Sequence, residues 1–309
     1  EISSWPDHEA VGDRLMDDDG IIIGVPIKVA VVLKKQGSNL SFDFSETADQ
    51  AKGPINIRPS LVRAACAYTV IASIGRSITV NQGILDAFDV ITRPGSLLEP
   101  ELPAPMNTYN PTVHAVINAG LDALGQIAPS SRRADGSDSR SLIFGFQRKK
   151  NAPGSAISYE IFAGGSGATA ETPGLPGCHV NQTNGRITPI EILETEYPLR
   201  IRQFSVLKET GGKGSSQGGD AFRREYESLT NGTQFSIRSS RHQIAPRGVS
   251  GGEDGRPGQA ILNPGSEQRE LASREINIPL DAGDIVRLDT PSGGGCGQVF
   301  NMQQKTAEA

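Results

Sequence analysis

Aromatic residues, cysteine and long apolar runs are all scarce in this sequence. Aromatic side chains account for 5% of its 309 residues, whereas glycine occurs 36 times and proline 20 times. The three cysteines, Cys66, Cys178 and Cys296, lie far apart without a CxxC pair, which argues against a disulfide framework and suits a reducing cytoplasm. No stretch approaches the roughly 18 apolar residues that span a bilayer. We therefore expect a cytoplasmic protein with no membrane partner.

Targeting signals and a strong charge of either sign are also missing. The chain opens with Glu1 and a polar stretch that lacks the basic and apolar regions of a signal peptide, which fits a processed chain or an internal fragment. The formal net charge is -5. Such mild acidity gives no reason to expect nucleic acid as a partner.

The glycine clusters contain no phosphate-binding motif. None of them forms GxGxxG between a strand and a helix, and the segment 212–214 lacks the Walker spacing. The string at 248–252 matches the GxSxG of a nucleophile elbow, but the Gly- and Pro-containing segment that follows cannot begin a good helix. We interpret the GxSxG string as a chance match, and we expect no nucleotide site on this chain.

Hydrophobic periodicity predicts an α+β fold. Residues 24–33 and 40–45 are typical of two strands in a hairpin around a glycine turn. Helices are predicted over 60–74, from an N-cap at Asn110, and from a capping box at 188–191. The first helix is apolar on most sides, so we expect it to be well buried.

The second half of the chain favours strands. From residue 199 onward, short β-type segments alternate with glycine turns, and the polar, basic stretch 130–150 is interpreted as a loop or a junction. We therefore expect an α+β region over 1–150, with a hairpin and two helices, and a glycine-rich, β-rich region over 151–309. Helices should concentrate in the first two thirds of the chain.

Glycine clusters are the most conspicuous feature of the composition. Glycine allows positive φ and lets the backbone approach a ligand or another backbone closely. We interpret most of the clusters as tight turns. They occur at 164–167, 211–214, 218–219, 251–252 and 293–297.

The segment 177–186 carries the best polar constellation. A thiol, an imidazole, carboxamides, a hydroxyl and a guanidinium fall within ten residues before a predicted helix, and they could bind a carbonyl or a carboxylate through charge-assisted hydrogen bonds. His179 could act as a base or a metal ligand, although a lone Cys-His pair is weak evidence for zinc. The alternative is a polar loop that satisfies its own backbone. The residues concerned are Cys178, His179, Asn181, Thr183, Asn184 and Arg186.

The other histidines carry less information. His114 flanks the apolar stripe of the second predicted helix, where a satisfied, half-buried imidazole is the simpler interpretation. His242 stands among basic and polar residues and could bind an anion or form part of a rim. His8 is expected to be solvated.

A series of spaced blocks resembles the hydantoinase B/oxoprolinase family. Asp43-Phe44-Ser45 followed by Gly53-Pro54-Ile55-Asn56 is the first of them. The resemblance extends over residues 25–300, and the blocks are specific when taken together. Further blocks are Asn81-Gln82-Gly83, Pro94-Gly95-Ser96, Gly164-Gly165-Ser166-Gly167, Thr183-Asn184, Arg186-Ile187-Thr188-Pro189, Glu196-Tyr197-Pro198, Gly211-Gly212-Lys213-Gly214 and Thr290-Pro291-Ser292-Gly293.

The resemblance implies a component of an ATP-dependent hetero-oligomer. A hydantoinase A-type partner subunit would bind ATP and Mg and phosphorylate the substrate carbonyl oxygen, and the B-type subunit would complete the reaction. The family's metal-binding Asp and His motifs lie in an N-terminal half that this sequence lacks, so any divalent metal is expected there. In many members a histidine stands where this sequence has Asn181.

Three functions follow from the resemblance as expectations. The first is the C-terminal part of a B-type subunit that opens a small cyclic amide, such as a hydantoin, 5-oxoproline or a lactam. The second is a subunit of an ATP-dependent ketone carboxylase, and the third is a scaffold without chemistry of its own. For the first, His179, Asn181 and Arg186 are the catalytic candidates, and Thr183, Asn184, Gly165 and Ser166 are the substrate-binding candidates.

Overall fold

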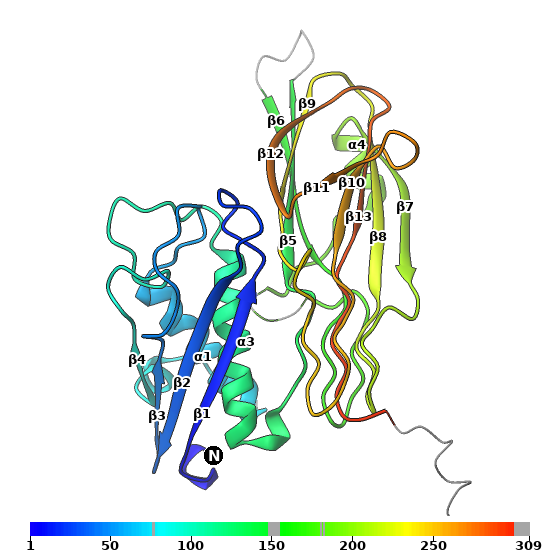
Figure 1. The fold of residues 1–309 in the computed structure, drawn as a ribbon. Helices are drawn as coiled ribbons and strands as arrows, with labels where there is room; N and C mark the ends of the chain where they lie inside the picture. The colour runs from blue at the N-terminus through cyan, green and yellow to red at the C-terminus, as the bar shows by residue number, and fades with distance from the viewer. Residues whose placement is uncertain (76–77, 148–154, 180, 182, 300–309) are drawn as a thin grey trace, which may run out of the picture.

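The computed structural model describes residues 1–75, 78–147, 155–179, 181 and 183–299 (Figure 1). Its mixture of helices and strands confirms the predicted α+β class, and the C-terminal third is rich in strands. Among the described residues, none of the helices combines the length and apolar character that a membrane crossing requires. The protein divides into a sheet covered by helices and a β-sandwich that lie side by side (Figure 1).

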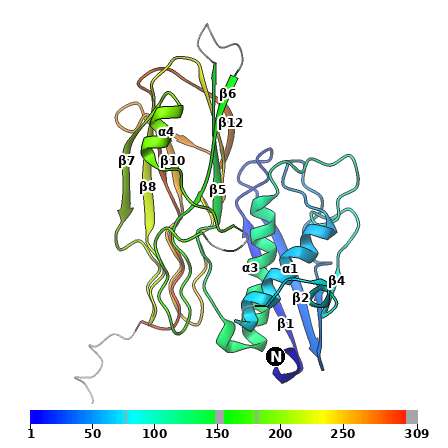
Figure 2. The same cartoon turned by 180° about the vertical axis from the view of Figure 1, so that it is seen from behind.

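The N-terminal layer is a four-stranded sheet with the order β1-β2-β3-β4. Strands β1 to β3 are antiparallel, whereas β3 and β4 are parallel. Two long helices cover one face of this sheet, as Figure 2 shows. The strands are β1 (His8–Met16), β2 (Ile27–Gln36), β3 (Asn39–Asp43) and β4 (Phe88–Ile91), and the helices are α1 (Pro59–Ile74), the short α2 (Gln82–Leu85) and α3 (Asn110–Ile127).

The predicted hairpin is confirmed as β2 and β3, and the first two predicted helices are confirmed as α1 and α3. Strand β1 was not predicted, because its inward positions hold Ala10, Gly12 and Arg14 while Val11 and Leu15 face solvent. Small inward residues let α3 approach closely. A Cβ added to Gly12 would lie 2.1 Å from the carbonyl oxygen of Ala119.

The C-terminal part is a sandwich of two sheets. One sheet has the order β11-β10-β13-β8-β7 and the other has the order β12-β9-β5-β6. Their facing sides share one core that includes Phe144, Tyr226 and Phe235. The strands are β5 (Ser139–Gln147), β6 (Ser155–Ala163), β7 (Leu199–Leu207), β8 (Ala221–Ser228), β9 (Thr233–Arg238), β10 (Gln259–Leu262), β11 (Arg269–Leu271), β12 (Arg274–Leu280) and β13 (Ile285–Asp289).

Strand β5 corrects the interpretation of 130–150 as a loop. It pairs with β6 on one side and β9 on the other, so Ser139–Gln147 belongs to the sandwich. The alternative interpretation of the stretch as a junction agrees with the start of the second core after Ile127. The expected boundary at residue 150 therefore falls within the β5–β6 hairpin, and the two hydrophobic cores divide between Ile127 and Leu142. The third predicted helix is α4 (Ile190–Glu196), but Pro189 is its N-cap and no side chain caps it, so the capping box of Thr188 is wrong.

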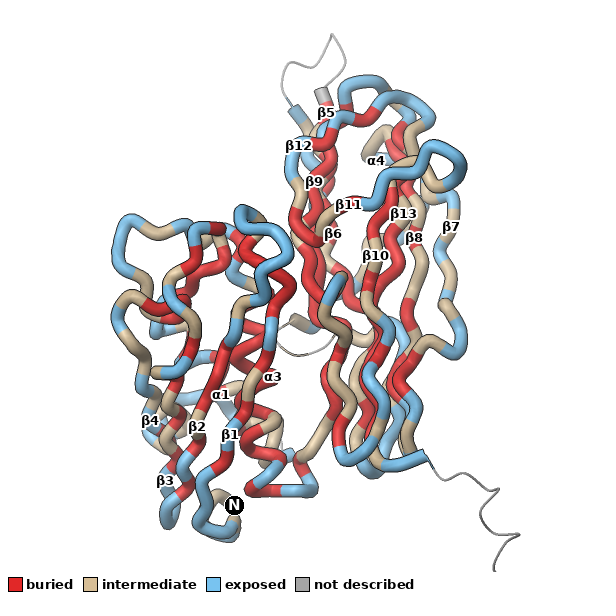
Figure 3. The backbone as a smooth tube through the Cα atoms, viewed as in Figure 1, coloured by how far each residue is buried: buried red, intermediate tan, exposed pale blue. Residues whose placement is uncertain are grey.

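Most of the glycine clusters do not form tight turns. Among the clustered glycines of the described chain, only Gly251 and Gly297 have positive φ. The clusters instead form extended segments below the sandwich that exchange backbone hydrogen bonds, such as Gly293 N–H to the Gly219 carbonyl at 2.8 Å. Residues 291–296 are all buried, and Figure 3 shows buried stretches continuing from the strands into these segments.

Close backbone approach explains why glycine is required there. A Cβ on Gly293 would lie 1.8 Å from the carbonyl oxygen of Ser166, and one on Gly165 would lie 1.9 Å from that of Gly219. Neither distance is compatible with a side chain, and the obstructing atoms are backbone that cannot rotate away. The interpretation as turns was wrong because sequence alone does not show which segments become neighbours.

We expect Gly293→Ala to lower the free energy of unfolding by about 3 kcal/mol, because the added methyl must push two backbone segments apart. Gly145→Ala is the matched control, since a Cβ there meets atoms of Gln234 at an ordinary 3.8 Å. Its effect should stay within about 1 kcal/mol. Urea unfolding of both variants measures the difference, and equal stabilities would contradict the close-packing explanation.

Candidate functional site

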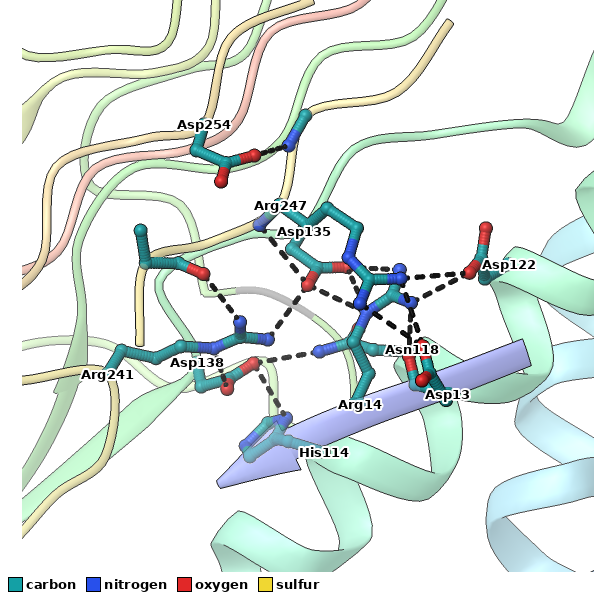
Figure 4. A network of polar contacts seen from close by, with 12 residues as sticks. Asp13, Arg14, His114, Asn118, Asp122, Asp135, Asp138, Arg241, Arg247 and Asp254 are labelled. Atoms are coloured by element: carbon teal, nitrogen blue, oxygen red, sulfur yellow. Dashed lines mark hydrogen bonds and ion pairs between the residues drawn. The ribbon is translucent and has the colours of Figure 1, made fainter. Parts of the chain in front are cut away.

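A buried network of charges joins the N-terminal layer to the sandwich (Figure 4). Arg14 on β1 donates from Nε to Asp135 Oδ2 at 2.8 Å. From the other side, Arg241 donates from Nη2 to the same oxygen at 3.0 Å and from Nε to Asp138 Oδ2 at 2.8 Å. All four side chains are at most 6% exposed. The network therefore fixes the loop 135–138 between the two parts of the protein.

Electrostatics keeps Asp135 ionised despite its burial. Burial opposes the charged form, but the neighbouring charges of Arg14 and Arg241 outweigh it and lower the pKa of Asp135 to about 2. Burial opposes the charge of Arg241 as well, but the carboxylates of Asp138 and Asp135 outweigh it and raise the pKa of Arg241. Asp135 is thus a fully engaged structural anion, and its oxygens are not available to a ligand.

A chain of amides leads from this network into a cavity. Asp138 Oδ1 accepts from Asn118 Nδ2 at 3.1 Å, and Asn118 Oδ1 accepts from Asn181 Nδ2 at 2.9 Å. Asn181 Oδ1 accepts in turn from the Tyr68 hydroxyl at 3.1 Å. Asn181 has a φ of 51°, a left-handed conformation that asparagine tolerates better than most residues. The loop that carries the predicted candidates is therefore tied to α1 and α3.

The cavity beside Tyr68 has a volume of about 230 Å³. It lies where α1, α3, the loop 133–136 and the glycine segment 166–169 meet, and polar groups make up much of its wall. Cys178, His179 and Asn181 close it on the side of the predicted constellation. Its size suits a small polar molecule.

His179 separates this cavity from a second, more apolar one of about 400 Å³. Phe162, Phe204 and Phe222 line the second cavity, together with Arg186. His179 Nδ1 lies 2.6 Å from the hydroxyl of Thr183, which orients the ring. Burial lowers the pKa of His179, and this imidazole is therefore neutral at pH 7.

The Nε2 atom of His179 is buried, and among the described residues none forms a hydrogen bond of good geometry with this ring nitrogen. The backbone of Ile161 nevertheless lies close enough to the imidazole to oppose the lowering of the His179 pKa. A neutral imidazole with one oriented nitrogen can accept or donate a proton. His179 is therefore a candidate for acid–base work, with an oriented and neutral ring.

The structure brings together some of the predicted residues and separates others. His179, Asn181 and Thr183 are in mutual or shared contact around the cavities, and Arg186 lines the second cavity from an exposed position. Ser166 lines the first cavity and accepts a hydrogen bond from the Leu175 N–H at 2.9 Å.

The remaining predicted site residues and histidines take other positions. Asn184 is exposed and lines none of the cavities described above, and Gly165 is packed against Gly219. His114 is fully buried rather than half-buried, with Nε2 at 2.9 Å from Ser139 Oγ. The backbone N–H of His242 donates to a buried aspartate, and His8 is exposed, as predicted.

Sequence reasoning missed the residues that build the walls of the first cavity. Tyr68 comes from α1, Asn118 from α3, and both Arg133 and Asp135 from the loop 133–136, and no spacing links them to the segment 177–186. Only the close approach of α1, α3 and the sandwich loops brings them together. Within the described residues, no group of three His, Cys, Asp or Glu side chains is arranged to hold a metal ion. The three cysteines are free thiols.

Fold and site together define a sheet-plus-sandwich protein with a small polar cavity at the junction of its two parts. The family model for Hydantoinase B/oxoprolinase matches residues 1–299, and the chain belongs to this family. A 5-oxoprolinase of Dictyostelium discoideum is 30% identical over 292 residues, which cover 94% of this chain and 22% of that protein.

Solved structures share the fold. An ATP-dependent caprolactamase from Pseudomonas jessenii matches with a TM-score of 0.85 and 20% identity, covering 99% of this chain and 55% of that chain. An acetone carboxylase matches with a TM-score of 0.79 and 13% identity, covering 96% of this chain and 46% of that chain. The chain thus spans between about a fifth and about half the length of these similar proteins.

We expect Asp135→Asn to lower the free energy of unfolding by about 3–5 kcal/mol, because it leaves Arg14 and Arg241 buried without their shared counter-charge. Asp49→Asn is the control, since Asp49 is 86% exposed in its ion pair with Arg93. Its effect should stay below about 1 kcal/mol. Chemical denaturation measures both, and a small loss for Asp135→Asn would show that the network contributes little.

Acidification should also destabilise the fold through His114. Burial lowers the pKa of this imidazole below its ordinary value of 6.5, so the unfolded chain takes up a proton where the folded protein does not. The contribution to stability is complete above pH 6.5 and is lost as the pH falls. Unfolding measured from about pH 7 to about pH 5 should show a shallower decline in His114→Asn, and an unchanged slope would refute the assignment.

Proposed function

We propose that this chain is the C-terminal part of a B-type subunit in an ATP-dependent cyclic amidohydrolase. The match to the Hydantoinase B/oxoprolinase family over residues 1–299 carries the proposal. Relatives named 5-oxoprolinase and a caprolactamase of the same fold both point to small cyclic amides as the substrate class. The polar cavity beside His179 has a volume that suits such molecules.

In this proposal the chain depends on other polypeptides for activation. A hydantoinase A-type partner subunit binds ATP and Mg and phosphorylates the amide oxygen, which makes the carbon electrophilic enough for water to open the ring. The N-terminal half of a B-type subunit supplies any divalent metal, because the described residues offer no ligand cluster for one. The assembly is a hetero-oligomer that acts in the cytoplasm.

The residues around the cavities then have separate roles. His179 presents Nε2 as the acid–base group, and Thr183 holds its ring. Asn181 positions this loop against α1 and α3, because its amide already bonds to Tyr68 and Asn118. Arg186, exposed at the edge of the second cavity, provides a cation for the phosphorylated substrate.

The likeness to acetone carboxylase favours a second candidate function. In that case a phosphorylated enol of a ketone would be carboxylated in place of ring opening. Release of ADP by the purified native complex distinguishes the two, with hydantoins, 5-oxoproline and lactams in one set of assays and ketones with bicarbonate in the other. Turnover with cyclic amides supports the first function, and turnover with ketones alone replaces it by the second. If removal of this chain abolishes activity only because the other subunits no longer assemble, the chain is a scaffold.

We expect Arg186→Ala to lower turnover about tenfold or more while the fold stays intact, because a charge-assisted contact to the activated substrate is lost. Arg200→Ala is the matched control. Arg200 is 53% exposed, pairs with Glu227 and lies outside both cavities. ADP release and circular dichroism of both variants test this, and unchanged turnover in Arg186→Ala would remove this side chain from the mechanism.

A further inference from the structure

The first cavity contains a cation without a counter-charge. Arg133 lines the cavity and is about half-buried, and among the described residues no carboxylate lies within 4.0 Å of its guanidinium. Its visible partners are neutral: Nη2 donates to the Ala72 carbonyl at 2.9 Å and Nε donates to the Ser131 carbonyl at 3.3 Å. The guanidinium is therefore held in place by neutral groups, and no hydrogen bond to the described residues is formed by Nη1.

Every other charge on the cavity wall is already neutralised. Asp135 is shared by Arg14 and Arg241, and His179 carries a lowered pKa caused by burial. Burial likewise lowers the pKa of Arg133, and the nearby Tyr68 hydroxyl is the group that opposes this shift. A partly buried cation with unused donors is stabilised when an anion enters its cavity.

The remaining wall also offers donors. The Ser166 hydroxyl accepts from the Leu175 N–H, which leaves its own proton available for a ligand in the cavity. Tyr68 gives its single proton to Asn181, so it offers no donor to a ligand. Arg133 and Ser166 together make a small site with one positive charge and hydroxyl support.

We propose that Arg133 and Ser166 form an oxyanion subsite in this cavity, which selects cyclic amides that carry a carboxylate. The inference rests on the proposed function and adds the feature that would separate one cyclic amide from another. 5-Oxoproline bears such a carboxylate, whereas an unsubstituted lactam does not. A phosphoryl group offers the same oxyanion chemistry, and direct binding distinguishes the two sources.

Calorimetric titration of the full-length protein in its native complex, without ATP, tests the subsite. The probes are L-5-oxoproline, pyrrolidin-2-one, which is the same ring without the carboxylate, and inorganic phosphate. We expect 5-oxoproline to bind on the order of tenfold more tightly than pyrrolidin-2-one, and this preference should vanish in Arg133→Gln. Arg63→Gln, with the same loss of charge on the exposed side of α1, should keep it.

Each outcome decides the matter. Phosphate binding that depends on Arg133, without a preference for 5-oxoproline, supports the oxyanion site and assigns it to a phosphoryl group. Affinities that are the same in Arg133→Gln and wild type overturn it. If Arg133→Gln does not fold, protection of Arg133 from phenylglyoxal in the wild-type protein replaces the variant. 5-Oxoproline or phosphate should slow this modification at Arg133 but not at Arg63, and equal rates with and without both probes overturn the subsite.

The binding assay is independent of turnover. If the complex releases no ADP with any cyclic amide, the proposed function is rejected, but the effect of Arg133 on oxyanion binding still stands. Turnover of 5-oxoproline that shows no dependence on Arg133 would reject the subsite alone.

Discussion

The shared carboxylate of Asp135 is the interaction on which the geometry of the site depends. It accepts from Arg14 on the first strand and from Arg241 beyond β9, so one buried anion links segments that are more than 200 residues apart in the chain. The attraction between the two guanidinium groups and the shared carboxylate compensates for the free-energy cost of removing these three ions from water. Because the loop 133–136 forms a wall of the first cavity, the same ion cluster that joins the two parts of the protein also shapes the cavity.

The glycine segments complete this arrangement from the other side. The Gly294 N–H donates to the Asp135 carbonyl at 2.9 Å, and the Ala168 N–H donates to the Gly294 carbonyl at 3.0 Å. Backbone segments approach this closely only without side chains between them. The glycine clusters therefore serve to place the loop of Asp135 and the residue Ser166 at fixed positions, and their role is that of a rigid support under the cavity.

Local pattern predicted those elements whose buried positions are apolar. Helices α1 and α3, the β2–β3 hairpin and the strand-rich end all follow from periodicity. Strand β1 was not predicted because Arg14 and Gly12 occupy its buried side. Arg14 is needed there to pair with Asp135, and Gly12 is needed to let α3 approach closely. At the site, the segment 177–186 was found because its polar residues are contiguous. Arg133 and Tyr68 were not, since only tertiary packing brings them beside it.

The carboxylate of Asp138, which pairs with Arg241, fixes the direction of every hydrogen bond that runs from the network to the cavity. A carboxylate only accepts, so Asn118 must turn its NH₂ toward Asp138 and its oxygen toward Asn181. Asn181 must then offer its NH₂ to Asn118 and its oxygen to Tyr68, which donates its single proton. The buried carboxylate thus determines that Tyr68 is a donor to Asn181 and has no proton left for a ligand in the cavity. The hydrogen-bond polarity of the cavity wall is in this way set by Asp138, which does not itself line the cavity.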